Sequence, residues 1–200
     1  MSEFNVVRIM DLVESIGENS VKEILSDFSC EYEEGNRNAE VEEFLRKNAI
    51  EFLRRKMSIT YLVMDDELQV YGYFTLTHKP IVIQDTVLKS KNTRKKLMRH
   101  AKFDDELGVY SLSAFLIAQF SKNYNIQPED RISGVDLMDL TLTYIEDIQE
   151  QIGGGVVFLE SEDHEGLLNF YERVPNSFVP FSVRYSDVDQ TKYIQLMRFL

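Results

Sequence analysis

The chain has 200 residues, of which 44% are hydrophobic and 12% aromatic, so it is long and apolar enough to bury one sizeable core. Four Pro and nine Gly are too few for a disordered or low-complexity chain. The net charge of -12 argues against a protein whose whole surface binds nucleic acid, because that function needs clustered Lys and Arg. We expect a single domain over residues 1–200.

The sequence favours a cytoplasmic protein without a membrane span or a metal. Its apolar runs are far shorter than the roughly 20 residues that cross a bilayer, and its acidic N-terminal residues do not match a secretory signal. Cys30 is the only cysteine, and His78, His100 and His164 are scattered, so neither an internal disulfide nor zinc spacing is present. We interpret Cys30 as a small semi-buried residue rather than a nucleophile.

The first elements in the chain are a strand and several helices. Residues 4–9 suit a strand, 10–16 and 20–28 suit two short helices, and 39–56 suit a long helix after a polar loop at 31–38. The long helix has apolar residues at helical spacing, acids in its first turns and bases in its last turn, as the helix dipole favours.

A β-hairpin is predicted next. Residues 58–64 and 68–76 are rich in β-branched and aromatic residues and are separated by an acidic turn. We expect Pro80 to end the second strand, because proline cannot donate to a central ladder.

A basic segment follows the hairpin. Residues 89–102 contain seven Lys or Arg residues and no acid, so the rest of the chain is more acidic than the average. A helix is predicted at 93–100, with Leu97 and Met98 facing the protein. This segment is either a solvated connecting helix or a patch that binds a partner.

The second half alternates strands and helices. Residues 109–120 are the longest apolar stretch and predict a buried strand, although their length also permits a helix. Apolar residues at helical spacing from Val135 predict a helix that ends at Gly153. The remaining predictions are strand 156–160, helix 165–174, turn 175–177, and strands 179–185 and 192–199. This alternation predicts a mixed α/β sheet.

The start of the helix near Val135 is a candidate anion site. The first amides of a helix have no internal acceptors and attract anions. Arg131 adds a guanidinium, and Gly134 has no Cβ that would keep a ligand from the backbone. Ser133 and Asp136 also match a capping box, which would satisfy the same amides without a ligand. Both interpretations stay open.

The order of these motifs resembles the GNAT N-acetyltransferase family. An apolar strand precedes Arg131-x-x-Gly134, an amphipathic helix follows it, and the strand 156–160 and the segment 169–172 come next. Segments of the first half resemble the toxin-type branch of that family, which acetylates the amino group of aminoacyl-tRNA. They are Phe28-Ser-Cys30, Phe44-Leu45 with Ala49, Thr60 to Val63, and Gly72 to Leu76.

The resemblance implies a mostly antiparallel mixed sheet flanked by helices, with a strand–loop–helix site for acetyl-CoA as co-substrate. It implies that Tyr171 is the general acid, whereas its helical spacing with Leu167 would otherwise suggest a core aromatic. It assigns one group of residues to the acetyl end and a second group to the phosphates of acetyl-CoA: Phe120, Ser121 and Lys122 to the acetyl end, and Arg131, Ile132, Ser133, Gly134 and Val135 to the phosphates.

The expected function is transfer of an acetyl group from acetyl-CoA to a primary amine of a small molecule or protein. The acidic composition favours a cationic amine. Two alternatives stay open: a tRNA-acetylating toxin that binds nucleic acid through residues 89–102, and a catalytically silent binding module. Glu160, Glu162 and Asp163 are candidates for the general base or a solvated strand end. The sequence is compatible with a homodimer and does not identify the acceptor.

Overall fold

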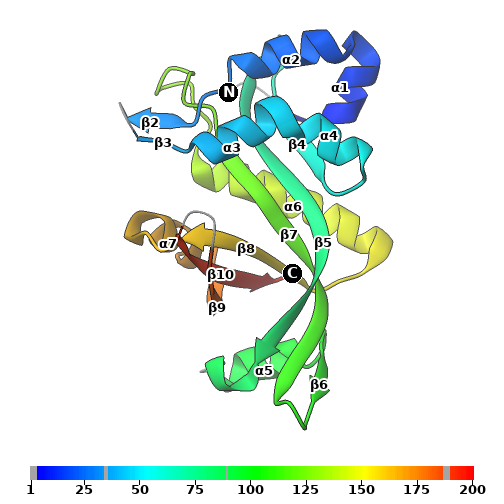
Figure 1. The fold of residues 1–200 in the computed structure, drawn as a ribbon, viewed down its shortest axis with the longest axis vertical. Helices are drawn as coiled ribbons and strands as arrows, with labels where there is room; N and C mark the ends of the chain where they lie inside the picture. The colour runs from blue at the N-terminus through cyan, green and yellow to red at the C-terminus, as the bar shows by residue number, and fades with distance from the viewer. Residues whose placement is uncertain (1–3, 34–35, 89, 187–189) are drawn as a thin grey trace. The chain divides into compact units, whose positions relative to one another are not determined.

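The structure is a computed structural model that describes residues 4–33, 36–88, 90–186 and 190–200 (Figure 1). The chain divides into two compact units. The first unit is Met1–Thr77 with Ala118–Thr141, and the second is His78–Ile117 with Leu142–Leu200. Three elements, β5 (Val70–Gln84), β7 (Val109–Lys122) and α6 (Gly134–Ile152), contribute residues to both units.

The strands of the first unit pair in antiparallel order. β1 (Asn5–Arg8) pairs with β4 (Ile59–Met64), and β4 pairs with the first half of β5. The predicted strand and hairpin are confirmed. β1 has two partly buried valines between exposed polar ends, whereas β4 and the first half of β5 are buried almost continuously, as strands covered on both faces should be.

Helices of the first unit pack on these strands and complete its core. They are α1 (Ile9–Ile16), α2 (Glu18–Ser26), α3 (Ala39–Glu43), the π-helix η1 (Phe44–Asn48) and α4 (Ala49–Arg54), and α1 and α4 pack against β4 (Figure 1). Phe28, Tyr73, Leu25 and Leu62 are fully buried in this core.

The long helix predicted at 39–56 contains a π turn in its middle. The Ala49 amide donates to the carbonyl of Phe44, five residues earlier. The turn holds one residue more than an α turn, so Ala49 and Ile50 share the buried side with Phe44 and Leu45. An unbroken α-helical stripe would have placed Asn48 there, but Asn48 is exposed.

The prediction of a polar loop at 31–38 is wrong. β2 (Glu31–Glu33) and β3 (Asn36–Arg37) pair as a small two-stranded sheet. Polar side chains hid these strands from the hydrophobic pattern, because β2 is exposed along its whole length.

The second unit contains one parallel strand pair among antiparallel ones. β7 pairs in parallel with β8 (Val156–Glu162), and β8 pairs antiparallel with β10 (Lys192–Phe199). β10 pairs antiparallel with β9 (Val179–Tyr185), and the short β6 (Lys102–Asp104) pairs with β7. The other elements are the 3-10 turn η2 (Asp85–Val87) and the helices α5 (Lys91–Leu97) and α7 (Glu165–Glu172).

Three details of the predictions are corrected. β5 continues through Pro80 to Gln84. Its pairing with β4 ends at Leu76, so no hydrogen bond to β4 is lost because Pro80 lacks an amide proton. Met98 is 61% exposed, and only Leu97 faces the protein. Val135 is also exposed, so the apolar stripe of α6 begins at Leu137.

The chain therefore has a mixed α/β fold with a mostly antiparallel sheet flanked by helices, as predicted. The strand predicted at 109–120 is β7, and the helical alternative for it is wrong. Within the described residues, no helix is long and apolar enough to cross a membrane.

Candidate functional site

The start of α6 forms the capping box that its sequence suggests. The Ser133 hydroxyl accepts a hydrogen bond from the Asp136 amide at 3.0 Å and donates to the Asp136 carboxylate at 2.6 Å. The Leu137 amide donates to the Ser133 carbonyl at 3.0 Å. Two amides of the first turn therefore already have acceptors, and a carboxylate lies where an anion was expected.

Arg131 holds the loop before α6 in place. Its Nε donates to the Ile126 carbonyl and its Nη2 to the Tyr124 carbonyl, both at 2.6 Å. Its guanidinium also lies 5.2 Å from the centre of the Tyr124 ring. Ile132, the next residue, is buried. The structure thus gives Arg131 a structural role beside the predicted phosphate contact.

The three residues predicted for the acetyl end are the last three residues of β7. Phe120, Ser121 and Lys122 are all half-buried. The Lys122 ammonium lies 5.3 Å from the centre of the Tyr124 ring that also carries Arg131. Burial, followed by the charge of Arg131, lowers the pKa of the Lys122 amine. The first unit therefore brings the two predicted groups together around Tyr124.

Asn123 is a buried residue at the end of β7 that sequence reasoning missed. Its backbone amide donates to the Tyr71 carbonyl, and its side-chain nitrogen donates to the Val70 carbonyl, both at 2.8 Å. Its side-chain oxygen accepts from the amides of Ser29 and Asn125, both at 3.0 Å. The available signal was an amide side chain directly after an apolar strand, a position where such side chains cap backbone groups.

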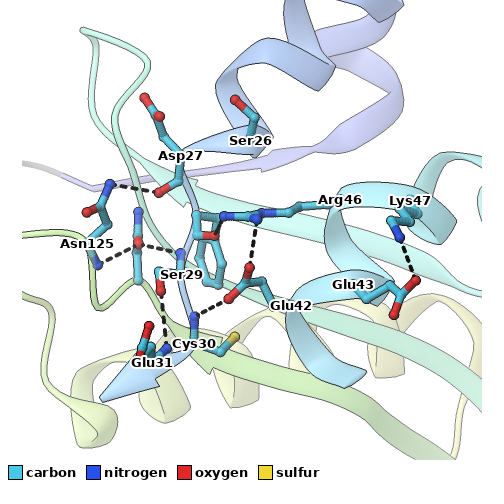
Figure 2. Close-up of polar contacts among 12 residues, drawn as sticks. Ser26, Asp27, Ser29, Cys30, Glu31, Glu42, Glu43, Arg46, Lys47 and Asn125 are labelled. Carbon is cyan, nitrogen blue, oxygen red and sulfur yellow. Dashed lines mark hydrogen bonds and ion pairs between the residues drawn. The ribbon is translucent and has the colours of Figure 1, made fainter. Parts of the chain in front are cut away.

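Glu42 and Arg46 are a second group that sequence reasoning missed. Glu42 is only 1% exposed, and its carboxylate accepts from the Cys30 amide at 3.0 Å and pairs with Arg46 at 2.7 Å (Figure 2). The sequence suggested only that Glu42 favours the start of a helix. The i,i+4 spacing with Arg46 was a usable signal.

Cys30 links this group to β7. It is buried, and its sulfur lies 3.2 Å from the Ser121 hydroxyl. Cys30 was expected to be a small semi-buried residue, and the structure buries it fully.

Gly72 marks a close approach in the first unit. A Cβ on this residue would lie 3.0 Å from the Leu137 side chain and 3.1 Å from the Ser121 carbonyl. β5, the first turns of α6 and the end of β7 therefore meet at a point where only glycine fits without displacement.

Tyr171 lies on α7 in the second unit. Its ring meets Phe170 edge to face at 5.0 Å and Phe178 at 6.1 Å between ring centres. Within the described part of its unit, the hydroxyl has no hydrogen-bond partner. Loss of hydration raises the pKa of the Tyr171 phenol to about 12, so it is protonated at neutral pH.

Two of the three candidates for a general base are engaged in ion pairs. Glu160 accepts from Arg184 at 2.7 Å and from Gln195 at 2.7 Å. Burial raises the pKa of this carboxyl, but Arg184 and Gln195 lower it more. Asp163 pairs with Lys192 at 2.6 Å, and Glu162 is exposed at the end of β8. The solvated-strand-end interpretation suits this group better than a poised base.

The basic segment is exposed for most of its length. Lys91, Lys95, Arg99 and Lys102 are exposed, whereas Arg94 pairs with Asp85 at 2.8 Å. Lys89 lies outside the described residues. Among the described residues, no group of three or more His, Cys, Asp and Glu could hold a metal ion.

The arrangement is that of a GNAT acetyltransferase fold, in the form found in toxin acetyltransferases. One similar solved structure is the toxin AtaT in complex with acetyl-methionyl-tRNAfMet, with a TM-score of 0.62 and 16% identity over 96% of this chain and 94% of that one. Another is AtaTR bound with acetyl-CoA, with a TM-score of 0.60 and 15% identity over 100% and 94%. A tyrosine-to-phenylalanine mutant of KacT matches with a TM-score of 0.62 and 14% identity over 98% and 95%.

No protein-family model and no curated protein matches the sequence. The likeness to these solved structures establishes the fold that the order of motifs suggested.

Proposed function

We propose that this protein is an N-acetyltransferase that moves an acetyl group from acetyl-CoA to a primary amine of a small molecule or protein. The observation that carries this proposal is the match of nearly the whole chain to the fold of solved structures that include a toxin bound with acetyl-CoA. The order of motifs in the sequence supports it independently.

The first unit supplies the residues that we assign to acetyl-CoA. The backbone of β7 at Phe120, Ser121 and Lys122 receives the acetyl and pantetheine end. The start of α6, from Arg131 to Val135, receives the phosphates, to which the positive end of the helix dipole and Lys122 add positive potential. The fit is partial at Asp136, because its carboxylate repels a phosphate at this position.

In the proposed reaction a neutral amine attacks the thioester carbonyl directly. Amides at the end of β7 stabilise the negative charge that develops on the carbonyl oxygen. Tyr171 is the general acid: its phenol is protonated at neutral pH, and its hydroxyl has no hydrogen-bond partner among the described groups of its unit. Positioning of the amine supplies much of the remaining acceleration.

The charge of the protein favours a cationic acceptor. The net charge of -12 attracts amines and raises their local concentration. The proton that the amine loses passes to water, since the acids at the end of β8 suit a solvated strand end better than a poised base.

Mass spectrometry of products tests the proposed function. The protein is incubated with acetyl-CoA and a pool of polyamines, amino acids, peptides and charged tRNA. We expect acetylated amines or peptides, and formation of free CoA at the same rate. The absence of any acetylated product and of free CoA would contradict the enzyme and leave a binding module.

A tRNA acceptor is the second candidate, and the exposed basic face of α5 and the residues after it favours it. The toxin AtaT has been solved with acetyl-methionyl-tRNAfMet, which supports the same choice. Replacing Lys95 and Arg99 by Gln should then weaken tRNA binding and flatten its salt dependence, because phosphate contacts release counterions. A small-amine enzyme should keep its activity in this variant.

A silent binding module is favoured by one observation, the capping box that occupies the first amides of α6. Thermal unfolding with increasing acetyl-CoA separates this case, because a ligand that binds only the native state raises the midpoint with its concentration.

A further inference from the structure

Glu42 and its neighbour Glu43 make the same kind of ion pair in opposite surroundings. Glu43 pairs with Lys47 at 2.7 Å, and both side chains are more than half exposed. Glu42 pairs with Arg46 at the same distance, but its side chain is 1% exposed (Figure 2). An exposed pair of this kind contributes little, whereas removal of one partner of a buried pair leaves an uncompensated charge.

The buried pair holds the segment Phe28–Cys30 by its backbone. Glu42 accepts from the Cys30 amide at 3.0 Å, and Arg46 donates from Nη2 to the Phe28 carbonyl at 2.5 Å. The Nε of Arg46 is buried and has no hydrogen-bond partner among the described residues, so the guanidinium makes its contacts through its two terminal nitrogens. Bonds between charged groups and backbone are among the stronger ones in proteins.

The other edge of the same segment contacts the end of β7. The Ser29 amide donates to the Asn123 side chain at 3.0 Å, and the Ser29 carbonyl accepts from the Tyr124 amide at 2.8 Å. The Cys30 sulfur reaches the Ser121 hydroxyl at 3.2 Å. Phe28–Cys30 is therefore a bridge between the Glu42–Arg46 pair and the strand end that contains Ser121.

One member of the buried pair lies in the π turn. Arg46 lies inside η1, the π-helical segment that interrupts the predicted helix. π turns are uncommon and are frequent at functional sites. The side of the helix that buries Glu42 is anchored in the core by Tyr73, whose hydroxyl donates to the Val41 carbonyl at 2.6 Å.

We propose that Glu42, together with Arg46, is a positioning residue for acetyl transfer: through Phe28–Cys30 it fixes the end of β7, where the proposed oxyanion amides lie. The inference rests on the proposed function, because it assumes that the end of β7 meets the thioester. Glu42 and Arg46 would then affect the geometry of acetyl transfer. They would not affect binding of the phosphates, which the start of α6 is proposed to hold.

The test is Glu42→Gln against Glu43→Gln, an identical change one residue along the same helix. With any acceptor that wild type acetylates, we expect Glu42→Gln to lower kcat by about tenfold to a hundredfold, because small displacements of a reacting geometry are costly. The KM for acetyl-CoA should change less than about twofold, since uniform binding is retained. Glu43→Gln should match wild type in both constants.

Amide hydrogen exchange is the second readout and does not depend on turnover. Glu42→Gln should speed exchange at the amides of Cys30, Ser29 and Tyr124, and Glu43→Gln should not. Where Glu42→Gln fails to fold, Arg46→Lys keeps the positive charge but loses the fork that reaches Phe28, and the same loss of kcat with unchanged KM is expected.

Equal kcat in Glu42→Gln, Glu43→Gln and wild type would overturn the inference and leave the proposed function intact. Unchanged exchange at Cys30 and Tyr124 would also overturn it. A wild type that binds acetyl-CoA but acetylates no acceptor removes the proposed function and this inference together, and it is recognised by the wild-type assay alone.

Discussion

Polar side chains at the start of α6 and in the loop before it already have hydrogen-bond partners, whereas the Tyr171 hydroxyl on α7 has none among the described residues of its unit. Arg131, Ser133 and Asp136 make hydrogen bonds with their own neighbourhood, to loop carbonyls and within the capping box. On α7, Tyr171 makes ring contacts, and its hydroxyl has no hydrogen-bond partner in the described part of its unit. The same family resemblance therefore pointed to one region where folding uses the polar groups and to one where a hydroxyl has no hydrogen-bond partner in the described part of its unit.

The largest expected effect is at Tyr171. Tyr171→Phe should lower turnover by about a hundredfold or more, because it removes the proposed general acid. Acetyl-CoA should stabilise the variant as it does wild type, since the hydroxyl has no structural partner in its unit. Steady-state kinetics and thermal unfolding measure the two quantities. Tyr185→Phe, at a 68% exposed tyrosine, is the control that should change neither.

Arg131 tests the other side of the comparison. Arg131→Lys keeps the charge but loses two hydrogen bonds to carbonyls, so we expect the free energy of unfolding to fall by about 2 kcal/mol. Urea denaturation measures it, and Arg173→Lys, at an exposed arginine, should be neutral. Unchanged stability combined with a large loss of acetyl-CoA affinity would mean that Arg131 serves the ligand rather than the loop.

Gly72 tests the packing that supports both proposed acetyl-CoA segments. Gly72→Ala places a methyl group 3.0 Å from Leu137 and 3.1 Å from the Ser121 carbonyl, and should destabilise the protein by about 1 kcal/mol or more. The Leu137 side chain can rotate, but the carbonyl belongs to the strand. Gly166→Ala, whose new methyl group meets only the movable His164 ring at 3.2 Å, is the control expected to cost less. Equal costs would show that the close approach at Gly72 is not restrictive.

Much of the fold could be predicted from patterns that burial imposes. The apolar run at β7 and the helical stripe of α6 were recognisable because each buries one type of surface. The π turn could not be predicted, because it shifts the apolar stripe of the helix by only one residue at Asn48, and such a shift leaves no distinct signal in the sequence. β2 and β3 could not be predicted either, because exposed polar strands look like loops.

The candidate site was less predictable than the fold. Arg131 and Tyr171 could be named from motif order alone. Asn123, Glu42 and Arg46 could not, because their importance lies in hydrogen bonds to backbone groups that are distant in sequence, such as Ser29 and Cys30. Polar residues in a sequence do not reveal which of them a fold will bury.

Asp136 should show two small effects of opposite sign. Asp136→Asn removes a negative charge from the positive end of α6, which should cost about 0.5 kcal/mol of stability. The same change removes a carboxylate from the proposed phosphate site and should tighten acetyl-CoA binding a few fold. Isothermal titration and urea denaturation measure the two effects, and Asp139→Asn, one turn further along α6, is the control. Weaker binding in Asp136→Asn would place the phosphates elsewhere.

The smallest expected effect is an absence of change with pH. An ordinary tyrosine loses half of its protons near pH 10, whereas burial raises the pKa of Tyr171 to about 12, so its protonated fraction stays nearly complete up to about pH 10. The turnover of wild type rises as the acceptor amine loses its proton, and Tyr171→Phe shares that rise. The ratio of the two turnovers isolates the phenol, and we expect it to stay constant from about pH 8 to about pH 10. A ratio that halves by about pH 10 would mean that the Tyr171 phenol has an ordinary pKa because water reaches it during the reaction. Its hydroxyl would then have water as a hydrogen-bond partner, and the contrast with the start of α6 would be one of solvent access.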